Sequence, residues 1–236
     1  MSKEKKNFVE SLRDMHRGKH IWIIGTGKSL DDFSDKFFNN KVSIGINGAI
    51  FKYPNSTWWF GHHEPWREYL RDERPDLLNK AIFCYPFPGT FPHNTTRIPE
   101  DFFGELTSIP YWLYFRDSTV MSKKEMKTPI CDIINKKQII PFRACKTVLH
   151  IAMEIAFLMG ASKITLVGCE NRKFENQDSH GDVGREYPWN YNWGAQHPIV
   201  REATKWLADL LIEEGVDTKR YYNSNTEFYT KGYEEI

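Results

Sequence analysis

Polar residues and glycines follow three short apolar segments of this sequence, and they are the first places to look for chemistry. A turn from Gly25 to Ser29 follows residues 20–24, Asn47 ends residues 41–47, and Glu170, Asn171 and Arg172 come just after residues 163–168. Each segment has the length and composition of a buried strand. Because the carboxyl ends of parallel strands meet at one edge of an open sheet, these residues are expected to line a common crevice.

The glycine turn matches neither of the two well-defined phosphate motifs. A P-loop needs glycine where the sequence has Trp22, and a dinucleotide fingerprint needs glycine where it has Leu30. Backbone N–H groups of the turn and the Ser29 hydroxyl could still face a nucleotide phosphate or ribose. A purely structural turn is the alternative. Asn47 stands where a nicotinamide-binding protein usually carries an acid, which argues against a dehydrogenase.

Histidines supply the candidate acids and bases. His62 and His63 are adjacent and would point to opposite faces of an extended chain, so a binding-site loop is favoured over a metal site. His150 shares a helix face with Thr147 and Glu154, where a buried structural role is the stronger expectation. His197 precedes Pro198 at the predicted start of a helix, whose dipole disfavours imidazolium and favours a basic, neutral ring. We expect His197 to act as a general base, with His180 as the second candidate and helix capping as the alternative.

The elements that must position these residues alternate between strands and helices along the chain. We expect an α/β, Rossmann-like, mostly parallel sheet with helices on both faces, in one domain over residues 1–236. Residues 147–171 form its centre, a nearly all-apolar helix ended by Gly160 and then a buried strand. Residues 86–141 are predicted to be an irregular insertion, and residues 171–196 an aromatic lid loop.

Composition excludes several classes of function. Lysine and arginine (32) nearly balance aspartate and glutamate (31), so the net charge of +1 gives no signal for nucleic acid. The four cysteines are scattered without a C-x-x-C pair, which predicts neither a zinc site nor a disulfide framework. The first residues lack a signal-peptide pattern, and we expect a cytoplasmic protein. Aromatic residues make up 15% of the chain, which suggests a surface that stacks on sugars or bases.

Three motifs resemble a known family. The turn GTGKSL, the strand end IGIN and the segment TVLHIAMEIAFLMGASKITLVGCE are similar to the pattern of the bacterial sialyltransferase and motility-associated-factor group of glycosyltransferases. The resemblance implies a Rossmann-like sheet that binds a nucleotide-sugar donor, CMP-sialic-acid-like or other, and a histidine base at His197. Lid tyrosines would help the donor phosphate leave, and Tyr187 and Tyr191 are the candidates. Glu170, Lys146 and Thr147 depart from the residues usual in that group.

The motif ends and the neighbouring strand end define the predicted donor site. Its residues are Gly25, Thr26, Gly27, Ser29, Asn47, His62, Arg143, Thr147, Glu170, Asn171 and Arg172. The sequence contains no D-x-D triplet, which favours transfer without a metal or other cofactor, the leaving phosphate being stabilised by cationic and hydroxyl groups. The partners would be a nucleotide sugar and a glycan or other hydroxyl acceptor, with peripheral membrane association if that acceptor is lipid-linked.

Two other functions stay open. A pyrophosphokinase similar to the pterin enzymes of related fold would need Mg²⁺ held by carboxylates such as Glu170 and Asp182. A non-catalytic nucleotide- or glycan-binding module would use the aromatic lid only to stack a ligand.

Overall fold

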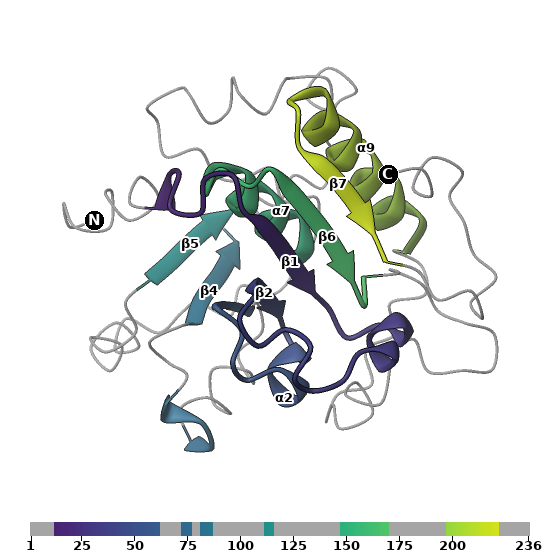
Figure 1. Cartoon of the computed structure of the whole chain (residues 1–236). Helices are drawn as coiled ribbons and strands as arrows, with labels where there is room; N and C mark the ends of the chain where they lie inside the picture. Colours follow the sequence, from purple (N-terminus) through teal and green to yellow (C-terminus); the bar gives the residue numbers. More distant parts are fainter. Residues whose placement is uncertain are drawn as a thin grey trace.

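In the part of the chain that the structure describes, seven parallel strands form one sheet. The structure is a computed structural model, and it describes residues 12–61, 72–76, 81–86, 111–115, 147–169 and 197–221. The strands are β1 (His20–Ile24), β2 (Val42–Ile46), β3 (Trp58–Gly61), β4 (Ala81–Pro86), β5 (Tyr111–Phe115), β6 (Lys163–Val167) and β7 (Asp217–Arg220). Their order is β5-β4-β3-β2-β1-β6-β7, and every neighbouring pair is parallel (Figure 1).

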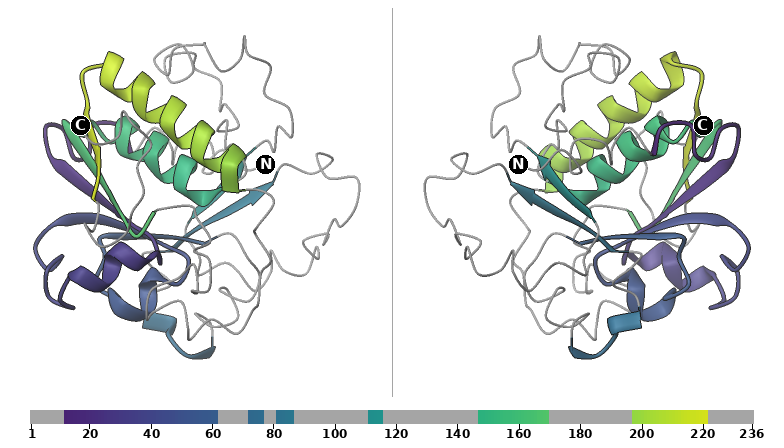
Figure 2. Two further views of the ribbon diagram at one scale, coloured as in Figure 1. Left: turned by 90° about the vertical axis from the view of Figure 1, so that its right-hand side faces the viewer. Right: turned by 90° about the vertical axis from the view of Figure 1, so that its left-hand side faces the viewer.

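Helices cover both faces of this sheet. The short η1 (Lys28–Asp32) and α2 (Ala49–Lys52) lie on one face, and α7 (Val148–Leu158) and α9 (His197–Glu213) lie on the other (Figure 2). The predicted fold class, an α/β sheet with helices on both faces, is therefore confirmed. No helix in the described part of the chain has the length and apolar character needed to cross a membrane.

Residues 111–115 correct one prediction. They fall inside residues 86–141, which were predicted to be an irregular insertion, yet they form β5, which pairs with β4 at the edge of the sheet. The segment is Tyr-Trp-Leu-Tyr-Phe, and aromatic residues favour extended chain. The segment does not alternate between apolar and polar residues, so the sequence pattern did not indicate a strand. The strand forms because its backbone hydrogen-bonds to β4. The rest of residues 87–141 lies outside the described residues.

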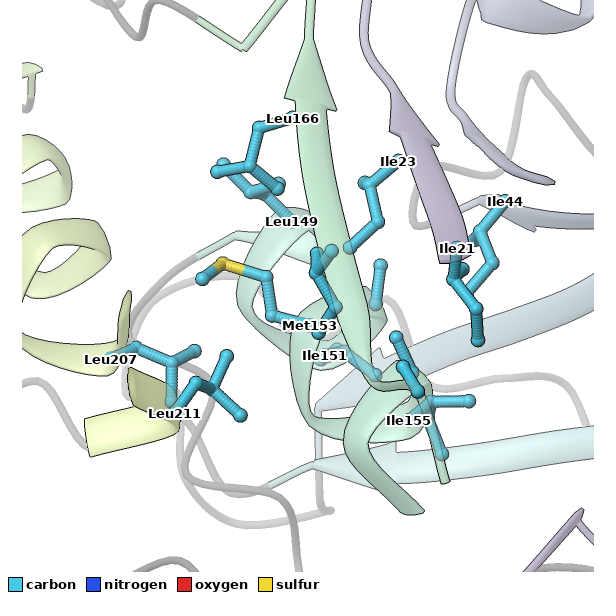
Figure 3. Packing of buried hydrophobic residues seen from close by; sticks show 14 of the residues in the cluster. Ile21, Ile23, Ile44, Leu149, Ile151, Met153, Ile155, Leu166, Leu207 and Leu211 are labelled. Atoms are coloured by element: carbon cyan, nitrogen blue, oxygen red, sulfur yellow. The ribbon is translucent and has the colours of Figure 1, made fainter. Parts of the chain in front are cut away.

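The helix α7 supplies much of the core. Thr147 precedes it in extended conformation and its hydroxyl accepts a hydrogen bond from the Leu149 N–H at 2.9 Å, a side-chain N-cap. All of its residues except Phe157 are buried. Gly160, with φ of 79°, ends the helical segment as predicted. Figure 3 shows side chains from α7 between those of the sheet, such as Ile23 and Leu166, and Leu207 and Leu211 of α9.

Two glycines allow the carboxyl ends of β1 and β6 to approach closely. A Cβ on Gly25 would overlap the Gly168 carbonyl group, and a Cβ on Gly168 would lie 2.9 Å from the Gly25 carbonyl carbon and oxygen. Gly168 also has φ of 65°, which favours glycine. The two backbones therefore pack against each other without side chains between them.

We predict that Gly168→Ala destabilises the protein more than Gly215→Ala. Gly215 also has positive φ, 85°, but a Cβ there meets nothing within 4 Å, so its replacement adds only backbone strain of about 1–2 kcal/mol. Gly168→Ala adds a steric clash of about 1–3 kcal/mol to the same strain. Urea denaturation of both variants measures the difference. Equal losses of unfolding free energy would contradict the close contact.

Candidate functional site

The order of the strands reverses between β1 and β6. The chain leaves β1 toward β2 on one side and returns through α7 to β6 on the other side. In open parallel sheets ligands bind outside the carboxyl ends of the strands at such a reversal. The turn after β1, the end of β2 and the end of β6 all lie at this edge of the sheet, as the sequence analysis expected. The candidate site is therefore the carboxyl edge of β1, β2 and β6.

The glycine turn is hydrogen-bonded to the end of β6. The Gly25 N–H donates to the Val167 carbonyl and the Gly27 N–H to the Gly168 carbonyl, both at 2.7 Å. These are two of the N–H groups that could have faced a phosphate. At Gly25 and Gly27 the structure thus agrees with the alternative of a structural turn, which joins β1 to β6.

Ser29 adds a side-chain hydrogen bond to the contact between the glycine turn and the end of β6. Its side chain is fully buried, and its hydroxyl oxygen accepts a hydrogen bond from the Gly168 N–H at 2.9 Å. A hydroxyl in this position satisfies a backbone donor that would otherwise be buried beside two glycines. Ser29 thus holds η1 against the end of β6, and its predicted contact with a ligand stays a prediction. Thr26 lies between the two glycines and is half-buried.

Asn47 differs from the other residues of this edge. It has φ of 47°, a left-handed conformation in which asparagine is enriched. Its backbone is held by β3, since its N–H donates to the Phe60 carbonyl at 2.9 Å and its carbonyl accepts from the Trp59 indole at 2.7 Å. Its side-chain oxygen Oδ1 is buried and has no hydrogen-bond partner among the residues that the structure describes. Buried acceptors without a partner are rare in native folds, and a bound water or ligand is one way to satisfy them.

Trp59 is a residue of the site that the sequence analysis missed. Its side chain is 2% exposed, and a Cβ on Gly61 would overlap its ring. The indole therefore lies across the carboxyl end of β3 while it fixes the Asn47 carbonyl. The signal was present in the sequence as a bulky aromatic two residues before a glycine at a strand end, a combination that fits a ring packed over missing side-chain volume.

The helices α7 and α9 begin at the same edge. A helix that connects parallel strands runs antiparallel to them, so its N-terminus lies at their carboxyl ends. Thr147, predicted to frame the donor, is half-buried and caps α7 with its hydroxyl. The prediction that a helix starts at His197 is confirmed, since α9 spans His197–Glu213. The backbone of residue 197 is thus at the end of a helix that opens onto the site.

The carboxyl end of β7 contributes an aromatic contact beside the turn. Tyr221 packs edge-on against Phe33, with ring centroids 4.5 Å apart, and its hydroxyl donates to an Asp32 carboxylate oxygen at 3.3 Å. Burial, and secondarily the Asp32 carboxylate, raise the pKa of the Tyr221 phenol. Tyr221 thereby ties β7 to the residues that follow the glycine turn.

Several predicted site residues lie outside the described residues. They are His62, Arg143, Glu170, Asn171, Arg172, His180, Tyr187 and Tyr191. The part of the chain that the structure describes contains no group of three or more His, Cys, Asp or Glu side chains that could hold a metal ion. Glu170 and Asp182, the carboxylates named for a magnesium-dependent alternative, fall outside it as well.

Comparison with known proteins gives distant structural similarities. No protein-family model matches the sequence, and a search of curated proteins finds no match. Two structures of the sialyltransferase CstII from Campylobacter jejuni, in complex with cytidine-5'-monophosphate and with CMP-3FNeuAc, are 11% identical in sequence, with TM-scores of 0.47 and 0.46. Each alignment covers 86% of this chain and 80% of that chain. A short-chain dehydrogenase from Oenococcus oeni is 12% identical with a TM-score of 0.20, over 89% of this chain and 82% of its own.

We predict that Ser29→Ala lowers the free energy of unfolding by about 1–3 kcal/mol, because it leaves the buried Gly168 N–H without its hydroxyl acceptor. Ser43→Ala is a matched control, since Ser43 is also fully buried and accepts the Thr57 N–H, at 3.3 Å, away from the turn. Chemical denaturation measures both losses. If Ser29→Ala kept full stability and lost only nucleotide affinity, the assignment of Ser29 to the turn would be wrong.

Proposed function

We propose that the protein is a metal-independent glycosyltransferase, which moves a sugar from a nucleotide-sugar donor to a hydroxyl acceptor. The donor would be CMP-sialic-acid-like or another activated sugar. The observation that carries the proposal is the buried, unpartnered Asn47 side-chain oxygen at the carboxyl edge of the sheet. The three sequence motifs that resemble bacterial sialyltransferases support it, because the glycine turn, Asn47 and the start of α7 all belong to this edge.

The chemistry of Asn47 suits the nucleoside part of a donor. A buried acceptor without a partner costs about 1–3 kcal/mol, and a ligand that brings an N–H or O–H to it removes that cost. Ribose hydroxyls and the exocyclic amine of a base are donors of this kind. The Trp59 indole holds the Asn47 backbone carbonyl, so the backbone from which the side chain projects is fixed before a ligand arrives.

Transfer of the sugar requires that the acceptor hydroxyl lose a proton as it attacks. In the proposed reaction the acceptor oxygen forms a bond to the anomeric carbon, and the bond from that carbon to the donor phosphate breaks. His197 would take the hydroxyl proton, since a neutral imidazole is an effective base near neutral pH. Arg143, Arg172, Tyr187 and Tyr191 would donate hydrogen bonds to the departing phosphate, which takes the electron pair.

We predict that Asn47→Gly weakens nucleotide binding about 5- to 10-fold, because the ligand loses one hydrogen bond of about 1 kcal/mol. Glycine keeps the positive φ, so the backbone is not strained. Asn40→Gly is the matched control, because Asn40 also has positive φ, 73°, but is exposed at the opposite end of β2. Thermal-shift titrations with CMP, UDP, GDP and ATP measure the affinities. Wild-type affinity in Asn47→Gly would overturn the assignment.

We predict that His197→Gln slows turnover of the preferred nucleotide sugar by about 10²- to 10⁴-fold and leaves nucleotide affinity unchanged. The assay is release of free nucleotide from a panel of nucleotide sugars, with water or an added glycan as acceptor. His20→Gln, at the start of β1 and thus at the opposite edge of the sheet, serves as the control. Should His197→Gln remain active while His180→Gln is inactive, His180 is the base.

The same assay separates the two alternatives. Turnover that persists in EDTA is expected for the transferase, whereas a pyrophosphokinase would convert ATP to AMP and lose this activity with the chelator. A binding module would be stabilised by nucleotide in the thermal-shift titration, but it would release no free nucleotide from any nucleotide sugar. Either of these results would replace the proposed function.

A further inference from the structure

Among the described side chains, one polar pair, His150 and Thr204, is hydrogen-bonded between α7 and α9 where the two helices also pack through apolar side chains. The His150 Nε2 and Thr204 Oγ1 atoms are 2.8 Å apart, a hydrogen bond between buried residues that are 1% and 0% exposed. Around them the two helices meet through aliphatic side chains, among them Met153, Leu207 and Leu211 (Figure 3). The pair therefore adds a directional interaction to apolar packing, which has no preferred direction.

The pair lies close to the edge that carries the candidate site. His150 is two residues into α7 from Val148, and Thr204 is seven residues along α9 from His197. Seven residues are nearly two helical turns, so positions 197 and 204 share one face of α9, about 10 Å apart along its axis. The first two turns of α9 thus lie between the hydrogen bond and the end of the helix that opens onto the site.

Apolar packing by itself tolerates small shifts of one helix along or around another. Aliphatic side chains gain nearly the same burial in neighbouring arrangements, whereas a buried hydroxyl and imidazole must meet at one distance and direction or lose their hydrogen bond. A hydrogen-bonded polar pair in a core therefore selects one arrangement of the two helices. A shift of about 1 Å in a group that takes part in chemistry can reduce a rate about 10²-fold.

We propose that His150 and Thr204 are positioning residues, whose hydrogen bond fixes α9 on α7 and thereby places residue 197 at the carboxyl edge of the sheet. This rests on the proposed function insofar as His197 is the base. The role assigns a purpose to the polar face of α7 that the sequence analysis regarded as structural: it acts on the site through the position of α9, and His150 itself does not touch the substrate.

The protein contains a matched control for this pair. His20 Nε2 and Thr165 Oγ1 form a second histidine–threonine hydrogen bond, also 2.8 Å long, between β1 and β6. His20 is the first residue of β1, so this hydrogen bond lies near the amino edge of the sheet and away from the candidate site. Thr204→Val and Thr165→Val each remove one hydroxyl and keep the shape of the side chain. Thr204→Ser keeps the hydroxyl and is the conservative rescue.

The test combines amide hydrogen exchange with steady-state kinetics on the nucleotide sugar that the wild-type protein hydrolyses. In Thr204→Val we expect faster exchange over residues 197–203, a fall in kcat of about 10- to 100-fold and an unchanged KM for the donor. Thr165→Val should leave exchange in that segment and kcat as in the wild type, and Thr204→Ser should restore both. If Thr204→Val does not fold, Thr204→Cys, with a weaker hydrogen-bonding group, replaces it in the same comparison.

The two readouts separate the two proposals. If Thr204→Val matches Thr165→Val in exchange over residues 197–203, the hydrogen bond does not position α9 and the inference is wrong. Normal kcat in Thr204→Val despite faster exchange would show that the position of α9 is irrelevant to turnover, which also overturns it. If the wild-type protein hydrolyses no nucleotide sugar, the proposed function fails, while faster exchange in Thr204→Val and its rescue by serine would still support the positioning of α9.

Discussion

The rest of the described structure depends on the backbone contact between Gly25 and Gly168. Two strands that are neighbours in the sheet must end at the same edge, and the chain after each must leave in a different direction. Glycine at both positions lets the two chains pass with no side chain between them, and the N–H groups of Gly25, Gly27 and Gly168 are then satisfied across the contact. This contact lies where the strand order reverses, which is the place where ligands bind in open parallel sheets.

The two faces of the sheet are packed by different means. On one face α7 and α9 bury aliphatic side chains, and on the other a cluster of rings surrounds Trp22, whose members are Phe33, Phe37, Phe38, Tyr53 and Tyr221. Most of these rings meet edge to face, the arrangement that their quadrupoles favour. The high aromatic content suggested a stacking surface for sugars, but these aromatic residues instead stabilise the packing of η1 and α2. Asn47 lies at the end of β2, directly before α2 on this second face.

The strands and the two long helices could be predicted from sequence because each repeats one simple pattern. The run from Lys163 to Val167 is apolar and β-branched, and α7 is capped by Thr147 and ended at Gly160, both signals that act locally. β5 could not be predicted, because an edge strand is defined by the neighbour that pairs with it rather than by its own periodicity. The role of Ser29 was hidden because its partner, Gly168, lies far along the chain. For Trp59 the sequence signal was the glycine two residues later, but its contact with the Asn47 carbonyl depends on the pairing of two strands. Asn47 was identified by its place after a strand, but only the fold reveals that its side-chain oxygen is unpartnered.

Several backbone N–H groups at the carboxyl edge of β1, β2 and β6 already have acceptors within the protein, which limits how this edge can bind a phosphate. In a dinucleotide-binding fold the glycine turn carries the pyrophosphate, whereas here the N–H groups of Gly25 and Gly27 already donate to β6. Thr147 similarly satisfies an N–H of the first turn of α7. A nucleotide would therefore be held at its nucleoside by Asn47, and its phosphate would be directed toward groups beyond the turn. The positive end of α9 opens on the same edge, and residue 197 begins it. In the proposed function an anion attracted there would meet the start of α9, so the position of this one helix would affect both the leaving phosphate and the proposed base.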